Sequence, residues 1–290
     1  MQMTTGQAGD VARWRDALNP PIYLVSVLPG LGVPLLAGGD RIAVAALLLA
    51  TFAVVLLQHA INLFNDAADW RLGADVDKRD SWVRVHDGRT RPVVLHAIVS
   101  LVTGGLLGLY VLWQQDRWWI LPAAAPLLVL GYLYNAGPRP LSYTHFGEWV
   151  TGLCYGPGVF GGLWLVAGLA PDARMLAGMA AFAALAMALL LSHQPPQIET
   201  DRAAGKRSFA VRYGADTTRR TARALFLLFI AALAVGALVS LRSPTALVFV
   251  ALGVFVTLRL YLGEVNPKRI LASASFVVAG GVALAIGWSS

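Results

Sequence analysis

A row of polar side chains follows a long apolar segment in the first quarter of the chain. Asn62, Asp66 and Asp69 are spaced i, i+4 and i+7, which places them on one face of a helix, with Asn65 beside them. Carboxylates at the edge of a hydrocarbon phase are costly unless they are paired or bind a metal, so they indicate function. Mg²⁺ takes one or two carboxylates together with substrate phosphates, a role that suits Asp66 and Asp69. The alternative is an acidic helix end paired with basic neighbours.

A second cluster follows another apolar segment and combines both signs of charge. Asp201 precedes Lys206 and Arg207 by a few residues, and Arg84 in the first long loop is a further candidate. A carboxylate for the metal and cations for phosphate oxygens form a reasonable diphosphate clamp. The alternative is an ordinary basic loop beside a membrane. We hypothesise that the two clusters together hold Mg²⁺ against a diphosphate whose tail lies in the membrane.

The composition indicates what must position these clusters. Of 290 residues, 57% are hydrophobic and 13% are charged, against about 25% charged in an average soluble domain. A membrane helix needs about 20 apolar residues. We therefore predict an all-α, polytopic membrane bundle of about nine transmembrane helices, formed by residues 1–290 as a single domain. The predicted spans are 20–38, 42–65, 93–114, 118–135, 147–169, 174–194, 222–241, 244–262 and 269–288.

The basic residues are distributed unevenly around these spans. Most lie on or beside the N-terminal segment and the loops at 66–92, 136–146, 195–221 and 263–268. The positive-inside rule then places the N-terminus and both long loops in the cytoplasm and the C-terminus outside. Both acidic clusters face the same compartment in this topology. We expect a multi-pass protein of the cell inner (plasma) membrane, embedded in the lipid bilayer, with no nucleic-acid partner.

The residues in these clusters also match a known family. The chain resembles the UbiA superfamily of intramembrane prenyltransferases, and it is most similar to the branch that prenylates 1,4-dihydroxy-2-naphthoate in menaquinone synthesis. The most specific match runs from Ile198 to Arg212 and contains Glu199-Thr200-Asp201-Arg202 followed by Gly205-Lys206-Arg207-Ser208. Further matches are Asn65-Asp66-Ala-Ala-Asp69, Leu18-Asn19-Pro20-Pro21, Arg84 with Gly88, and the loop from Tyr134 to Tyr143 with Gly147-Glu148.

The resemblance implies a reaction and a set of roles. A polyprenyl diphosphate would ionise with the help of Mg²⁺, and an electron-rich carbon of an aromatic acceptor would attack the allylic cation. The catalytic and metal-binding residues would be Asp66, Asp69 and Asp201. Tyr132, Tyr134 or Tyr143 could face the cation, but an interfacial aromatic belt is the favoured explanation for these tyrosines. The implied substrate-binding residues are Asn62, Asn65, Arg84, Tyr134, Gln197, Lys206 and Arg207.

Two positions depart from the branch pattern. Gln197 stands where the first aspartate of the second motif is expected, and His193 replaces an asparagine. Both departures point to a different acceptor as one alternative. A transporter is another, but it would place its charges near mid-span and show repeat symmetry. A lipid-headgroup phosphotransferase is the third, since Asp87-Gly88-Arg89 resembles the start of its signature, yet the D-x-x-x-D that should follow is missing.

Overall fold

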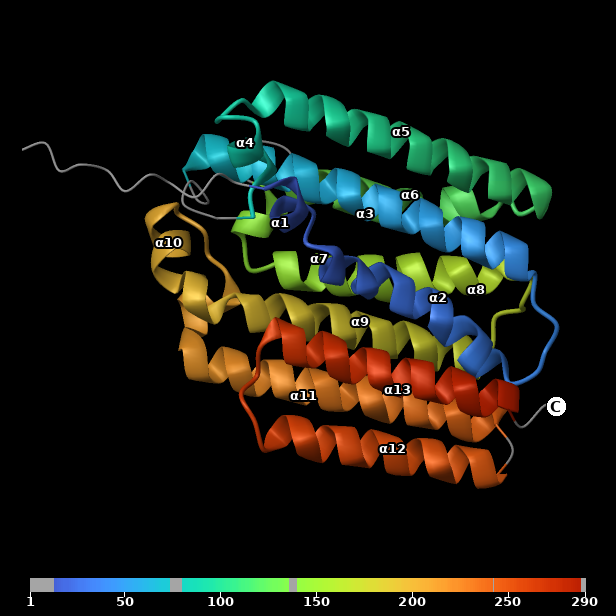
Figure 1. Cartoon of the computed structure of the whole chain (residues 1–290). Coiled ribbons are helices and arrows are strands. Elements are labelled where there is room, and N and C mark those ends of the chain that lie inside the picture. The colour runs from blue at the N-terminus through green and yellow to red at the C-terminus, as the bar shows by residue number, and fades with distance from the viewer. Residues whose placement is uncertain (1–12, 74–79, 136–139, 242, 288–290) are drawn as a thin grey trace, which may run out of the picture.

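The described part of the chain is a bundle of helices. A computed structural model describes residues 13–73, 80–135, 140–241 and 243–287, and these residues form helices joined by short turns and loops (Figure 1). Eight helical segments among them are long and apolar enough to cross a membrane, and α6 (Ile120–Asn135) is a shorter apolar helix. The prediction of an all-α membrane bundle of about nine helices is therefore confirmed.

The described elements comprise long helices and several short helices and turns. The first membrane segment combines α1 (Trp14–Leu18), the 3₁₀ turn η1 (Pro20–Tyr23) and α2 (Leu24–Ala37), with its break at Asn19. A later segment combines α7 (Gly147–Leu153), the π-helix η3 (Cys154–Gly161) and α8 (Gly162–Val166). The remaining long helices are α3 (Val44–Leu72), α5 (Thr90–Gln114), α9 (Ala173–His193), α11 (Phe209–Ser240), α12 (Ser243–Tyr261) and α13 (Pro267–Gly287). The remaining short elements are α4 (Trp82–Val85), η2 (Leu141–Tyr143), η4 (Pro195–Gln197) and α10 (Ile198–Ala203).

Two helices extend beyond the spans predicted from hydropathy. The span predicted at 42–65 continues as α3 to Leu72, where Gly73 adopts φ 78° and ends the helix. The span predicted at 222–241 begins at Phe209, with a kink at Gly214. Both extensions are polar, so a span predicted from hydropathy is shorter than the helix that contains it. As a result, Asp66 and Asp69 lie on a continuous helix rather than at its margin.

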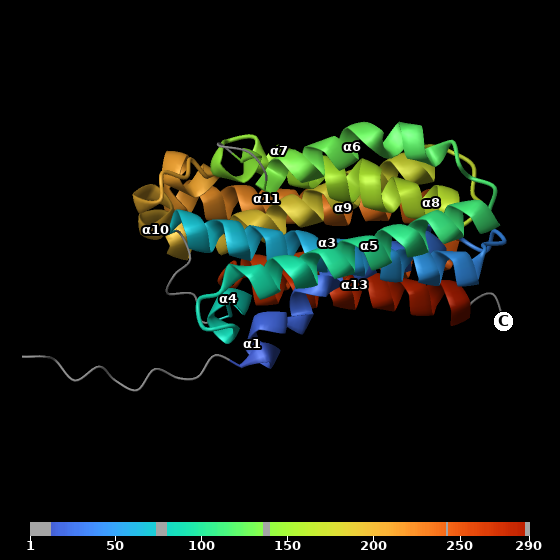
Figure 2. The ribbon, with the colours of Figure 1, turned by 90° about the horizontal axis from the view of Figure 1, so that it is seen from above.

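The short elements gather at one end of the bundle. Figures 1 and 2 show α1, α4 and α10 together at this end, whereas the last residues of α13 lie at the other. We call the end with α1, α4 and α10 the acidic end, because α3 brings Asp66 and Asp69 to it. Both motif-bearing segments thus reach the same end, as the predicted topology requires.

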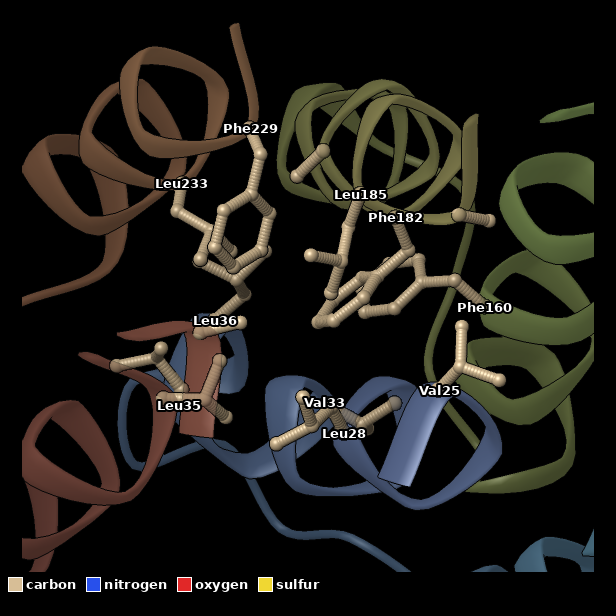
Figure 3. Packing of buried hydrophobic residues seen from close by; sticks show 14 of the residues in the cluster. Val25, Leu28, Val33, Leu35, Leu36, Phe160, Phe182, Leu185, Phe229 and Leu233 are labelled. Atoms are coloured by element: carbon tan, nitrogen blue, oxygen red, sulfur yellow. The ribbon is translucent and has the colours of Figure 1, made fainter. Parts of the chain in front are cut away.

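The core of the bundle includes packing between α2, η3, α9 and α11. Phe182 of α9 stacks on Phe160 of η3 with a centroid distance of 5.2 Å and meets Phe229 of α11 edge-on (Figure 3). All three rings are buried. Gly178 makes this possible, because a Cβ there would lie 2.0 Å from the ring of Phe160. The absence of that side chain lets η3 approach α9 closely.

Candidate active site

A cavity of about 380 Å³ lies at the acidic end. Residues from α3, α6, α7, α9 and the segment around α10 contribute to its lining, so the two predicted clusters do meet. Among the predicted site residues, the cavity is lined by Asn62, Asn65, Asp66, Asp69, Tyr134, Gln197, Asp201 and Lys206.

Two predicted cations lie outside this lining. Arg84 is a half-buried residue of α4, and the side chain of Arg207 is exposed. The backbone N–H of Arg207 donates to the carbonyl of Tyr143 at 3.0 Å, which anchors this segment beside η2. Lys206 is therefore the basic residue of the second motif that the structure brings to the cavity.

Asp69 is the centre of the polar contacts in the cavity. Its Oδ2 accepts hydrogen bonds from Asn65 Nδ2 at 3.0 Å and Lys206 Nζ at 3.2 Å. Its Oδ1 accepts from the hydroxyl of Tyr143 at 2.8 Å. Only 1% of Asp69 is exposed. A carboxylate this deeply buried is stable only with such partners.

Tyr143 contacts both charged residues of the site, and that it faces an allylic cation stays a prediction. Its hydroxyl is committed to Asp69, and the ammonium of Lys206 lies 4.8 Å from the centre of its ring. It therefore orients the acidic residue and the basic residue of the site. Tyr132 is 72% exposed on α6, away from this cavity, and only Tyr134 of the three predicted tyrosines lines it.

Asp66 joins α3 to the start of α4. Its Oδ2 accepts from the hydroxyl of Ser81 at 3.1 Å and from the backbone N–H of Val83 at 3.2 Å. Ser81 is also the N-cap of α4. The carboxylate therefore holds the start of α4 beside the cavity, where Trp82 contributes to the lining.

The second motif turns sharply to bring Lys206 back over Asp201. Gly205 has φ 75°, its N–H donates to Arg202 O, and the next N–H, of Lys206, donates to Asp201 O at 2.8 Å. This is the glycine-terminated helix end known as a Schellman motif. Lys206 Nζ then lies 3.9 Å from Asp201 Oδ1, while Asp201 Oδ2 accepts from Ser208 at 2.9 Å. One ammonium is thus placed between a carboxylate from each motif.

A buried carboxylate–amide pair in the cavity wall has no role in the predicted site. Glu148 Oε1 accepts from Gln194 Nε2 at 2.8 Å and from the N–H of Phe209 at 3.0 Å. Gln194 Oε1 accepts in turn from the N–H of Ala210. The pair fastens α7, the end of α9 and the start of α11 together. An acidic residue at the start of a predicted apolar span was the signal that could have identified it.

The carboxylates of the cavity could bind Mg²⁺ together with a substrate, but they do not form a metal site by themselves. Within the described ranges, no three His, Cys, Asp or Glu side chains converge into a ready metal cluster. The cavity instead offers separate carboxylates, Asp66, Asp69 and Asp201, with Lys206 between two of them. Mg²⁺ usually keeps several waters and bridges one or two carboxylates to substrate phosphates rather than occupying an all-protein cage. The residues therefore fit an ion that enters with its diphosphate.

A second, larger cavity lies on a neighbouring face of α3. Its volume is about 930 Å³, and α3, α5, α6 and η3 all contribute to its mostly apolar lining. Ile61 and Phe64 point to this cavity, whereas Asn62 and Asn65 point to the acidic one. Helix α3 thus contributes to the lining of both the polar chamber and the apolar chamber.

These features define a class of protein: a multi-pass membrane bundle with a buried acidic chamber at one end and an apolar chamber beside it. Residues 24–280 match the UbiA prenyltransferase family. The chain belongs to this family and is a prenyltransferase. The transporter and phosphotransferase alternatives are therefore set aside.

Individual relatives agree with this assignment. A 1,4-dihydroxy-2-naphthoate octaprenyltransferase from Mycobacterium tuberculosis is 32% identical over 217 residues, which cover 72% of each chain. The Bacillus subtilis protein of the same name is 25% identical over 227 residues, covering 74% of this chain and 72% of the relative. A UbiA homolog from Archaeoglobus fulgidus, solved with GPP and Mg²⁺, superposes with a TM-score of 0.68 at 18% identity. It covers 94% of this chain and 98% of its own, which supports the fold alone.

Proposed function

We propose that the protein transfers a prenyl group from a polyprenyl diphosphate to an aromatic acceptor, 1,4-dihydroxy-2-naphthoate or a related ring, in quinone biosynthesis. The observation that carries the proposal is Lys206 between Asp69 and Asp201, since it joins the two motifs into one charged site. The names of the relatives supply the acceptor class.

The side chains of the acidic chamber would bind and orient the diphosphate. Asp66, Asp69 and Asp201 would hold a Mg²⁺ ion, which when bound neutralises charge on the departing diphosphate. Lys206 would exchange part of its contact with Asp69 for phosphate oxygens, because its ammonium is already held at the chamber by two carboxylates. Asn62 and Asn65 would donate amide hydrogen bonds to the same oxygens. The partly dry chamber strengthens each of these interactions.

The apolar chamber offers a place for the isoprenoid tail. Its walls include Val54, Leu57 and Ile61 of α3 and Leu127 of α6. This lining matches the apolar surface of a hydrocarbon chain. A tail in this chamber and a diphosphate in the other would place the reacting carbon near the polar face of α3.

The acceptor would be selected at the far wall of the acidic chamber. His193 and Gln197 both line the chamber, and both depart from the pattern of the naphthoate branch. A neutral amide at position 197 changes the hydrogen bonds available to a ring substituent. For this reason, prenyl transfer to a different acceptor of the same aromatic class is the second candidate function.

The site would face the cytoplasm of a cell whose inner membrane holds the bundle. The basic residues concentrate around the acidic end, including Lys206, Arg207, Arg212 and Arg219. Because positive residues are retained on the cytoplasmic side, both substrates would enter from that side or from the bilayer.

The test is a product assay with purified protein in lipid. Radiolabelled geranyl diphosphate and Mg²⁺ are supplied with 1,4-dihydroxy-2-naphthoate or with 4-hydroxybenzoate. We expect a prenylated naphthoquinol, with Asp216→Asn as a control because Asp216 is exposed on the surface of α11 and pairs there with Arg219. Absence of any prenylated ring with either acceptor would refute the proposal, and product with hydroxybenzoate alone would establish the second candidate.

A further inference from the structure

The hydroxyl of Tyr23 on η1 belongs to a side chain of the acidic chamber to which the proposed roles above assign no function. Tyr23 is half-buried and lines the chamber. Its hydroxyl lies 2.5 Å from Nδ1 of His59 on α3, and it has no other hydrogen-bonding partner within the described part of the chain. A phenolic hydroxyl can both donate and accept a hydrogen bond. The contact with His59 uses one of these capacities and leaves the other for a molecule in the chamber.

A second imidazole and an indole fix the orientation of His59. Its Nε2 lies 3.2 Å from Nε2 of His96 on α5, and the ring of Trp82 packs edge-on against both imidazoles at centroid distances of 5.8 and 5.2 Å. His59 is buried and His96 is half-buried. Ionisable groups inside a membrane bundle are costly and indicate function, and a buried polar chain holds its members in place. The nitrogen that contacts Tyr23 is therefore held in one position.

The residue before His59 holds the backbone of η1 next to Tyr23. Gln58 is buried, its Nε2 donates to the carbonyl of Ile22 at 3.2 Å, and its Oε1 accepts from the hydroxyl of Ser26 at 2.6 Å. This amide alone ties η1 to α3, whereas His59 contacts the hydroxyl at the tip of Tyr23. Backbone and hydroxyl are thus held separately by consecutive residues of α3. Such support of one polar group is the arrangement that a precise binding site requires.

We infer that Tyr23 hydrogen-bonds to a ring hydroxyl of the aromatic acceptor and selects acceptors that carry one, an inference that rests on the proposed aromatic prenyl transfer. A hydroxyl group supplies the electron density that makes a ring carbon nucleophilic, so recognising it distinguishes a reactive ring from an inert one. The chamber lining also includes Leu18, Ile22 and Trp82, whose apolar surfaces suit the face of such a ring. An acceptor without the hydroxyl would leave the oxygen of Tyr23 unpaired and would bind more weakly.

Both directions of the hydrogen-bond chain are compatible with this role. If Tyr23 donates to Nδ1 of His59, then Nε2–H of His59 donates to His96, and the oxygen of Tyr23 accepts from the ring hydroxyl. If Nδ1–H of His59 donates to Tyr23, then His96 donates to His59, and Tyr23 donates to the ring oxygen. A hydroxyl on the ring matches either case because it can donate and accept. Tyr23 keeps its proton throughout, and His59 and His96 are positioning residues that act through it.

The experiment compares Tyr23→Phe with Tyr110→Phe in the purified protein in lipid, using labelled geranyl diphosphate, Mg²⁺ and 1,4-dihydroxy-2-naphthoate. Tyr110 is an exposed residue of α5 whose hydroxyl accepts from Gln114 Nε2 at 2.7 Å, so its variant is a matched control that also loses a hydrogen-bonded phenol. A hydrogen bond between neutral groups corresponds to a factor of about 3 to 10 in binding. We expect Tyr23→Phe to raise the KM for the acceptor by this factor and to leave the KM for geranyl diphosphate unchanged.

Acceptor analogues separate recognition of the hydroxyl from a purely structural role of Tyr23. Inhibition constants are measured for 1-hydroxy-2-naphthoate, 4-hydroxy-2-naphthoate and 2-naphthoate in competition with the acceptor. Tyr23→Phe should weaken inhibition by at least one hydroxynaphthoate about 3- to 10-fold and leave inhibition by 2-naphthoate unchanged, because 2-naphthoate has no ring hydroxyl. Equal weakening of all three compounds, or no change in any of them, would overturn the inference while leaving the proposed function intact.

Variants of His59 test whether the imidazole acts through Tyr23. His59→Leu removes both hydrogen bonds of the ring and should reproduce the loss of discrimination seen in Tyr23→Phe. His59→Asn keeps an amide near the place of Nδ1 and should retain part of it. Should His59→Leu fail to fold, Tyr23→Phe decides, because it removes one oxygen and keeps the ring. A wild-type protein that forms no prenylated product would instead refute the proposed function, and the inference with it.

Discussion

Lys206 connects the residues that the sequence placed in two separate motifs. Its side chain is 14% exposed and reaches carboxylates of α3 and α10 at once. Without a cation between them, two buried carboxylates would repel each other. In the absence of substrate, the positive charge of Lys206 thus offsets part of the negative charge of Asp69 and Asp201. When a diphosphate binds with its metal, contacts of the carboxylates with the metal and of Lys206 with the diphosphate would replace contacts between Lys206 and the carboxylates.

The carboxylates of α3 give the first prediction at the residue scale. Asp66→Asn and Asp69→Asn keep the size of the side chain but remove its charge, so the fold should persist while metal and diphosphate binding weaken. We expect prenyl transfer to fall about 10²-fold or more. Product formation by variants with wild-type elution from a sizing column measures this. Asp216→Asn should retain full activity, and near-normal turnover in both chamber variants would reduce this cluster to a structural helix end.

Gln197 gives a second prediction at the same scale. A carboxylate at this position would add a charged ligand at the wall of the chamber, so Gln197→Asp should lower the Mg²⁺ concentration needed for half-maximal activity. If Gln197 selects the acceptor instead, the same change should alter the ratio of rates with dihydroxynaphthoate and hydroxybenzoate. Both quantities come from one set of assays. No change in either would show that position 197 is outside the site.

At the scale of elements, hydropathy predicted which segments cross the bundle but not where the helices end. The apolar part of α3 was evident, yet its polar extension from Asn65 to Leu72 carries two of the site carboxylates. The helix persists there because Ala67 and Ala68 favour it and Gly73 stops it. The spacing of Asn62, Asp66 and Asp69 predicted their shared face correctly.

Side-chain contacts between segments that are far apart in the chain could not be predicted from one sequence. The pairing of Glu148 with Gln194, and of Asp69 with Tyr143, depends on how α7, η2 and α9 pack against α3 and α11. No periodicity within one segment encodes such a pairing. Arg84 and Arg207 illustrate the converse, since both were placed near the diphosphate by their motifs but neither is among the residues that line the acidic chamber.

The opposite end of the bundle provides a prediction about an element. Asp172 caps α9 by accepting from the N–H groups of Arg174 and Met175 at 2.9 and 3.0 Å. Burial alone would raise the pKa of Asp172, but these hydrogen bonds and Arg174 outweigh it and hold the pKa below its usual value. Loss of such a cap costs about 1 kcal/mol. We therefore expect Asp172→Ala to unfold at a lower temperature than wild type in thermal denaturation near neutral pH.

The sign of the pH dependence follows from the lowered pKa. A carboxylate with a depressed pKa stabilises the fold at pH values above its unfolded pKa, and this contribution is lost as the pH falls through the folded pKa. The difference between Asp172→Ala and wild type should therefore shrink in acid. Asp216→Ala, which removes an exposed ion pair with Arg219, should change the melting temperature little at either pH. A difference that grows in acid would contradict the cap.

At the scale of the whole molecule, the acidic end and the C-terminal end of α13 lie at opposite ends of the bundle (Figure 2). The basic residues around the acidic end predict a cytoplasmic site and a C-terminus outside the cell. A C-terminal fusion to alkaline phosphatase, which is active only outside the cytoplasm, should therefore be active. A fusion within the loop at 263–268 should be inactive. The reverse pattern would invert the topology and place the active site on the wrong side for a cytoplasmic diphosphate.

The central claim is that the acidic chamber transfers a prenyl group with a divalent ion held by its carboxylates. The most direct measurement is transfer of labelled geranyl diphosphate to 1,4-dihydroxy-2-naphthoate by the purified protein, first in excess chelator and then during titration with Mg²⁺. The leaving diphosphate must be neutralised in a partly dry site, and Lys206 alone supplies one charge. We predict no product in chelator, full recovery with Mg²⁺, and a recovery that Asp69→Asn shifts to higher Mg²⁺ concentration. Full activity in excess chelator would contradict the account.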